Sequence, residues 1–224
     1  MDRKIEIRIR RGTRVLLTVL AIWGGAVATA AQTGLLAAIY PLVLAAIIAL
    51  GIVIPVIVYA MSKGFQAYIK AIGLRPLTVF HIWRIGAALL FFWYGAHDLL
   101  PPVFVLVAGW GDLIAGLLAL GITVLAESRT RYLVFEIFGF ADFVAAVGIG
   151  LTMFLLHDPR MASIQILPMA LIPFYGVGIS GASHVIAFDL LRRGVGIKYQ
   201  MQPHIAQAQQ SGGRGIVDNV AKPL

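Results

Sequence analysis

The chain has 224 residues, of which 60% are hydrophobic and only 12% are charged, and its formal net charge is +8. This composition excludes an ordinary soluble domain, which needs more charged side chains to cover its surface. The absence of cysteine excludes disulfides, thiolate nucleophiles, iron–sulfur clusters and cysteine-bound zinc.

The apolar residues form six long blocks, separated by short polar connections. A block of about 20 apolar residues matches a hydrocarbon layer roughly 30 Å thick. The blocks are residues 15–31, 35–61, 77–99, 101–126, 132–156 and 163–190. We therefore predict an all-α protein, a polytopic bundle of six transmembrane helices over residues 15–190. Pro168 and Pro173 are expected to kink the last helix near its outer end.

A basic leader, residues 1–14, precedes the first block. Its alternating isoleucines would suit a short strand, but an amphipathic stretch on the membrane surface is the preferred interpretation. A rival interpretation makes residues 1–30 a cleavable signal peptide, because Ala28-Thr29-Ala30 resembles a cleavage site. We favour an anchored helix, since Gly24-Gly25 interrupts the apolar core and the next block comes almost at once.

The positions of lysine and arginine predict the orientation. They gather in the leader, in the connection 63–75, in the turn 127–131 and after residue 190, whereas the alternate connections carry almost none. Only Arg160 departs from this pattern. The positive-inside rule then places both termini in the cytoplasm (N-in, C-in) of a bacterial cytoplasmic (inner) membrane protein.

The same basic segments are expected to contact anionic lipid headgroups and not nucleic acid, because they lie between apolar blocks and at the two ends of the chain. The tail, residues 191–224, is polar and rich in Gln and Gly. It lacks helical periodicity, so we predict a disordered cytoplasmic end.

The most informative motif occurs twice. Gly109-Trp110-Gly111-Asp112 in the fourth block and Gly139-Phe140-Ala141-Asp142 in the fifth share the order glycine, aromatic, small, aspartate, and they lie thirty residues apart. At 1.5 Å per residue, both aspartates fall near the middle of the bilayer. Small residues on the aspartate faces allow two antiparallel helices to approach closely. We therefore expect this hairpin to bring two carboxylates together.

Two ionised carboxylates in the bilayer interior need protons or a nearby cation. Arg84 in the third block and His184 in the sixth lie at a suitable depth, so we predict one buried polar cluster of Arg84, Asp112, Asp142 and His184. The functional interpretation is a proton or cation relay, or a polar substrate site. The structural interpretation is that these ion pairs only hold helices together. Glu136 is expected to reach the membrane interface.

The histidines raise a second hypothesis. His81 and His184 lie on the cytoplasmic side and would be the axial ligands of a haem b. A second haem on the outer side is disfavoured, because His157 lies in a loop and His97 points away from the face that carries His81. No haem, and no metal site, is the preferred expectation.

No sequence motif of a known enzyme class is present. The chain has no P-loop, no H-E-x-x-H and no G-x-S-x-G, and the aspartates lack the flanking pattern of intramembrane aspartyl proteases. No catalytic residues are therefore predicted.

Three stretches are similar to a group of small uncharacterised bacterial membrane proteins. They are Arg84-Ile85-Gly86, the segment from Pro102 to Gly109-Trp110-Gly111-Asp112, and the segment from Leu167-Pro168 to Pro173 with His184 after it. The resemblance implies a six-helix fold with a G-x-G-D motif and supplies no activity.

From the residues themselves we predict a small secondary transporter or proton-coupled permease built around the polar cluster. The alternatives are a haem-b electron carrier and a non-catalytic membrane scaffold or subunit. A homo-oligomer or a membrane partner is compatible with each of the three.

Overall fold

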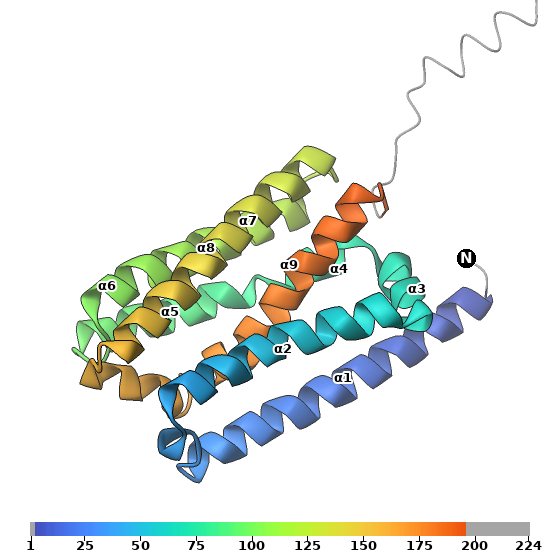
Figure 1. Cartoon of the computed structure of the whole chain (residues 1–224). Helices are drawn as coiled ribbons and strands as arrows, with labels where there is room; N and C mark the ends of the chain where they lie inside the picture. The colour runs from blue at the N-terminus through green and yellow to red at the C-terminus, as the bar shows by residue number, and fades with distance from the viewer. Residues whose placement is uncertain (1–2, 196–224) are drawn as a thin grey trace, which may run out of the picture.

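The computed structural model describes residues 3–195, and every regular element in this range is a helix (Figure 1). Six helical stretches are long and apolar enough to cross a membrane. They are Glu6–Gln32, Pro41–Met61, Leu74–Ala96, Pro102–Val124, Arg129–Leu155 and Ile172–Arg192. The prediction of an all-α protein with six helices long and apolar enough to cross a membrane is confirmed. The tail predicted to be disordered falls outside the described residues from 196 onward.

The basic leader and the first span form one continuous helix, α1 (Arg3–Gln32). The leader is therefore not a strand. It contains no proline, and the helix continues through Gly12 into the apolar block. Gly12 packs on the ring of Tyr68, so the leader touches the rest of the bundle and does not lie apart from it.

The second span, α2 (Pro41–Met61), begins with a proline at its first position, where a missing N–H costs no hydrogen bond. The connection after it is itself helical, α3 (Lys63–Ile72). The Ser62 hydroxyl caps it by accepting a hydrogen bond from the Phe65 amide at 3.2 Å. Gly73 then adopts φ 77°, a value that favours glycine, and separates α3 from the next helix.

The third span is broken into α4 (Leu74–Phe80) and α5 (Trp83–Ala96). His81 and Ile82 form the turn between them, with the Arg84 amide bonded to the His81 carbonyl at 3.1 Å. The sequence offers no glycine or proline at this turn, so the break was not predicted. It places His81 at a helix end in the middle of the bundle.

The fourth and fifth spans form the predicted hairpin. The fourth begins with a short helical turn, α6 (Pro102–Phe104), continues through a π-helical turn, η2 (Val105–Gly109), and ends as α7 (Trp110–Val124). The fifth, α8 (Arg129–Leu155), is continuous. A π-turn inserts one extra residue into the helix and rotates the residues beyond it about the helix axis, so η2 sets the face on which Asp112 lies.

The last span starts later than predicted. Residues Pro159–Gln165 form a separate 3₁₀ helix, η3, and the span begins with a π-turn, η4 (Ile172–Gly176), that leads into α9 (Val177–Arg192). Pro168 lies in the turn before the helix and does not kink it, whereas Pro173 lies in the π-turn. The span does not begin at Ser163, because Ser163 lies in this 3₁₀ helix and the extended backbone of Ile166 (φ −113°, ψ 156°) ends it before the span starts.

Helix α9 is the central element of the bundle. In its apolar stretch 67% of the residues are buried, against 6% in α1. Figure 1 shows α1 and α2 on one side of α9 and the hairpin of α7 and α8 on the other. Both α2 and α8 pack against α9 but make few contacts with each other, so a gap remains between them.

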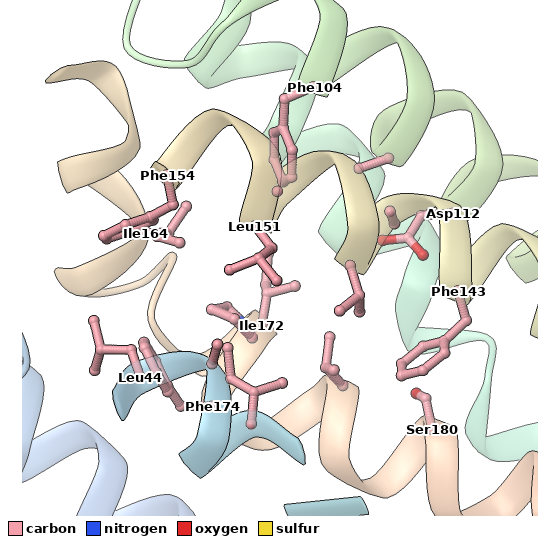
Figure 2. A pocket seen from close by; sticks show the side chains of 18 of the residues that line it. Leu44, Phe104, Asp112, Phe143, Leu151, Phe154, Ile164, Ile172, Phe174 and Ser180 are labelled. Atoms are coloured by element: carbon pink, nitrogen blue, oxygen red, sulfur yellow. The ribbon is translucent and has the colours of Figure 1, made fainter. Parts of the chain in front are cut away.

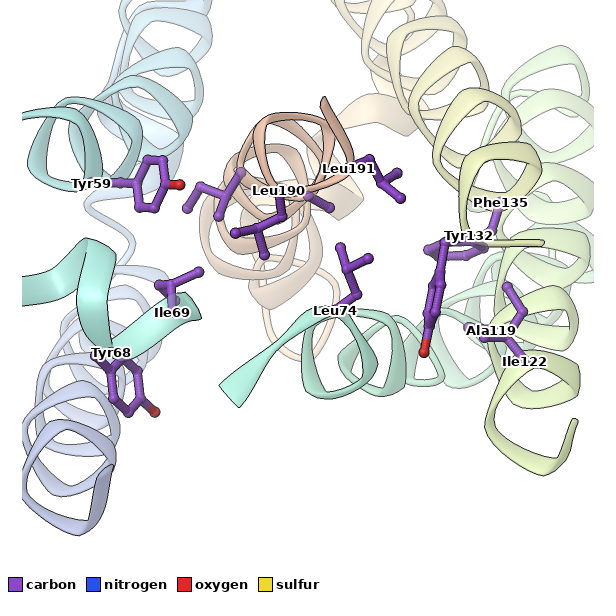
Figure 3. Close-up of a cluster of buried hydrophobic side chains, with 12 residues drawn as sticks. Tyr59, Tyr68, Ile69, Leu74, Ala119, Ile122, Tyr132, Phe135, Leu190 and Leu191 are labelled. Carbon is purple, nitrogen blue, oxygen red and sulfur yellow. The ribbon is translucent and has the colours of Figure 1, made fainter. Parts of the chain in front are cut away.

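One end of the bundle, here termed the basic end, carries the start of α1, helix α3, the start of α8 and the end of α9. An apolar cluster closes this end with side chains from α2, α3, α4, α7, α8 and α9 (Figure 3). Ile9, Leu16 and Val195 pack against the same cluster, which places both ends of the described chain on one side. Arg129 bonds the Leu191 carbonyl there at 3.3 Å.

The opposite end holds Arg160, the basic residue that departs from the charge pattern. Its guanidinium forms ion pairs with Asp158 at 2.7 Å and with Asp98 at 3.0 Å. The hydrogen bond from Arg160 lowers the pKa of Asp158 below its usual range. Two carboxylates therefore offset the positive charge of Arg160 at this end.

Candidate functional site

The centre of the bundle contains the predicted ion pairs. The Nε of Arg84 donates to Oδ1 of Asp112 at 2.6 Å, and its Nη2 donates to Oδ2 of Asp142. The guanidinium also reaches the Gly139 carbonyl through Nη1 at 3.4 Å. The side chain of Arg84 is only 3% exposed. One guanidinium thus holds together α5, α7 and α8, and each of its nitrogens has a partner.

Glycines make this approach possible, as the repeated motif predicted. A Cβ on Gly111 would overlap the Asp142 carboxylate, and a Cβ on Gly116 would lie 2.6 Å from the Ile85 side chain. A Cβ on Gly139 would lie 2.7 Å from the His184 ring and 3.6 Å from Arg84 Nη1. The small residues therefore leave the space that the buried polar side chains occupy.

Glu136 lies in the same group of buried polar side chains as Arg84, Asp112 and Asp142, here termed the polar region. This position corrects the expectation that Glu136 reaches the membrane interface. It is 1% exposed, and its Oε2 shares a hydrogen bond with Nδ1 of His184 at 2.5 Å. His184 therefore pairs directly with Glu136, and it reaches Arg84 only across Gly139. Sequence reasoning placed Glu136 close to a helix start. The structure begins α8 at Arg129, three residues earlier than predicted, which puts Glu136 two turns inside the helix.

A second histidine completes the region. The His81 and His184 ring centroids lie 4.2 Å apart, and Nε2 of His81 bonds the Ser183 hydroxyl at 2.9 Å. That hydroxyl donates to the Ser180 carbonyl at 2.8 Å, so it accepts from Nε2 of His81. Nδ1 of His81 and Nε2 of His184 are both buried without a hydrogen-bond partner in the structure.

A cavity of about 300 Å³ adjoins the ion pairs (Figure 2). Arg84 and Asp112 lie at one end of it, together with Ser180, and its remaining walls are apolar. Figure 2 shows Asp112 and Ser180 on either side of the Phe143 ring, with Leu44 and Ile164 at the distant end. Most lining residues of α2 and α8 are half-exposed, for example Ile48, whereas Leu44 and Phe143 are buried. The cavity is therefore not fully enclosed along these two helices.

The histidines do not fit a haem in this arrangement. Axial ligands approach the iron from opposite faces of the porphyrin, which needs space between the two imidazoles. His81 and His184 are tilted against each other at 4.2 Å, and each already bonds a protein side chain through one nitrogen. No porphyrin fits between rings that are in van der Waals contact.

Among residues 3–195, no group of three or more histidine, aspartate or glutamate side chains is arranged to hold a metal ion. The guanidinium of Arg84 occupies the space between the two aspartates that a metal ion bridging them would need.

A family model described as a domain of unknown function (DUF8737) matches residues 41–192. The chain belongs to this family. The matched range starts at the first residue of α2 and ends at the last residue of α9, so it contains the whole polar region and the cavity, and α1 lies outside it. No curated protein and no solved structure matches the chain.

Proposed function

We propose that this chain is a small proton-coupled membrane carrier, in which the cavity binds the substrate and the adjoining polar residues bind the coupled protons. The observation that carries this proposal is the contact between the two features, since Arg84 and Asp112 belong to the ion-pair network and also form the end of the cavity. Ion pairs that only held helices together would not need a cavity beside them.

The charges in this region favour proton binding. The polar region holds three carboxylates but only one permanently charged cation: Arg84 pairs with Asp112 and Asp142, whereas Glu136 pairs with His184. Buried charge without compensation is costly in a bilayer interior. Neutrality therefore requires two protons, distributed among the three carboxylates and the two histidines. Groups that share protons in this way can release or take up one when a charged ligand arrives.

The broken third span and the two π-turns support a carrier. Irregular helix segments in membrane proteins occur where the backbone lines a cavity or a binding site. Here the turn at His81, η2 and η4 all lie next to the polar region or the cavity.

We further propose that the basic end faces the cytoplasm of a bacterial inner membrane, with both termini inside. The basic residues of this end support this orientation through the positive-inside rule, since in the described chain the connections at the opposite end carry a single basic residue, Arg160.

The proposal of a proton-coupled carrier is tested with two variants, Asp112→Asn and Asp142→Asn. The purified protein is reconstituted into liposomes that contain a pH-sensitive dye, and decyl chains with a permanently cationic, permanently anionic or neutral head are added outside. In the wild-type protein we expect at least one of these compounds to change the internal pH, and we expect both variants to abolish the change. Asp98→Asn, which alters a carboxylate outside the polar region, is the matched control and should retain it.

Size-exclusion chromatography of each variant establishes that it is folded before transport is measured. Wild-type rates in either aspartate variant would refute the role of the polar region. A wild-type protein that moves no protons with any of the three compounds would refute proton coupling itself.

A further inference from the structure

We infer that the cavity binds an amphiphilic monocation, a molecule with an apolar chain and one positively charged head, and that its head lies beside Asp112. This inference rests on the proposed function for the role of substrate, but it concerns binding and can be measured without transport.

The charge at the closed end of the cavity favours a cation. Asp112 and Asp142 together carry two negative charges when ionised, and Arg84 supplies one positive charge. The remaining negative charge attracts either a proton or a positively charged head. Because both compete for the same carboxylates, binding of the cation would release a proton, which couples the two movements.

The hydrogen bonds at this end disfavour an anion. Three of the five N–H groups of the Arg84 guanidinium already donate, to Asp112, Gly139 and Asp142. An anionic head that approached the other two would lie next to the Asp112 carboxylate, which lines the same end of the cavity and would repel it. By contrast, Asp112 accepts from Arg84 through Oδ1, so its second oxygen is available to a donor or a cation.

The aromatic side chains of the cavity are a second reason to expect a cationic ligand. Trp83, Phe91, Phe104 and Phe143 line the cavity, and Phe143 lies beside Asp112 in Figure 2. The face of an aromatic ring attracts a cation, and the attraction is stronger where water is excluded. The indole of Trp83 donates to the Ser180 hydroxyl at 3.3 Å, which holds this ring in place at the charged end.

The rest of the cavity determines the shape of the ligand. From Asp112 the walls continue as apolar side chains to Leu44 and Ile164, and they include half-exposed residues of α2 and α8. An apolar chain can therefore extend from the charged head along these walls. Its volume must be close to the cavity volume of about 300 Å³.

The experiment is native mass spectrometry of the full-length protein with three compounds that share a decyl chain. Decyltrimethylammonium is a permanent cation, decanesulfonate a permanent anion, and 1-decanol is neutral. We expect one equivalent of decyltrimethylammonium to bind at least about tenfold more tightly than the other two. Equal binding of all three compounds would overturn the inference and indicate a site for any apolar chain. Tighter binding of decanesulfonate would also overturn it, because the site would then prefer an anionic head.

Two variants locate the bound cation. Asp112→Asn is expected to remove the preference for decyltrimethylammonium while leaving weak binding of 1-decanol, and Leu151→Trp, which fills the apolar part, is expected to weaken all three compounds. Asp98→Asn is the control. A cationic preference that survives Asp112→Asn would place the cation elsewhere and refute the inference.

The transport assay keeps the two proposals distinguishable. Preferential binding of the cation without proton movement would refute the carrier but not the ligand class. Proton movement driven only by the neutral or the anionic compound would refute the ligand class but not the carrier.

Discussion

At the scale of single residues, Arg84 is the side chain on which the interior depends. It is the only positively charged partner of Asp112 and Asp142 within residues 3–195, and all three side chains are nearly buried. Removing one partner of a buried ion pair leaves an uncompensated charge, whereas removing all members together leaves none. The effects of substitutions here should therefore be far from additive.

We predict that Arg84→Gln lowers the free energy of unfolding by about 3–5 kcal/mol, because two carboxylates then remain buried without a cation. The triple variant Arg84→Gln, Asp112→Asn and Asp142→Asn should recover most of this loss, since no charge is left. Thermal unfolding in detergent measures the stability of both variants. Arg192→Gln, at a side chain that is 79% exposed, should change stability by less than about 1 kcal/mol. A triple variant less stable than Arg84→Gln would contradict the prediction.

At the scale of the helices, close packing at glycine decides which side chains meet. Helix α8 contains one glycine that is packed against other side chains and one whose Cβ position is open. Gly139 faces His184 and Arg84, and Gly148 has no other side chain or segment within 4 Å of its Cβ position. The two residues thus form a matched pair on one element, one inside the polar region and one outside it.

We expect Gly139→Ala to destabilise the protein by about 1–3 kcal/mol, because the new Cβ would lie 2.7 Å from the buried His184 ring, which Glu136 holds in place. Gly148→Ala should leave stability unchanged or raise it by up to about 1 kcal/mol, since alanine is the better helix former. Thermal unfolding of both variants measures the difference. Equal effects would show that the polar region tolerates displacement of His184.

At the scale of the whole molecule, the two ends of the bundle differ in charge and in closure. The basic end is sealed by an apolar cluster and carries most of the lysine and arginine, whereas Arg160 at the other end is paired with two carboxylates. The cavity extends from the polar region toward this second end. The two ends thus present different surfaces, as expected for the proposed carrier.

The absence of native cysteine allows the orientation to be tested with single introduced cysteines. Lys70→Cys lies on the exposed face of α3 at the basic end, and Ala162→Cys lies on exposed η3 at the opposite end. We predict that a membrane-impermeant maleimide labels Ala162→Cys in intact cells and labels Lys70→Cys only after the membrane is opened. The reverse pattern would invert the proposed topology.

Hydropathy by itself determined that the chain has six spans, and the repeated motif pointed to Asp112 and Asp142, because the length of an apolar block and the spacing of residues are local properties of the chain. Depth along each span also singled out Arg84 and His184. Which of these side chains bond one another depends on how the helices are rotated, and rotation is set by packing against neighbours. The tertiary structure alone therefore joined both aspartates to Arg84, paired His184 with Glu136 and placed His81 at a helix break. The cavity was equally beyond the sequence, because it arises where α2 and α8 both pack against α9 and leave a space between them.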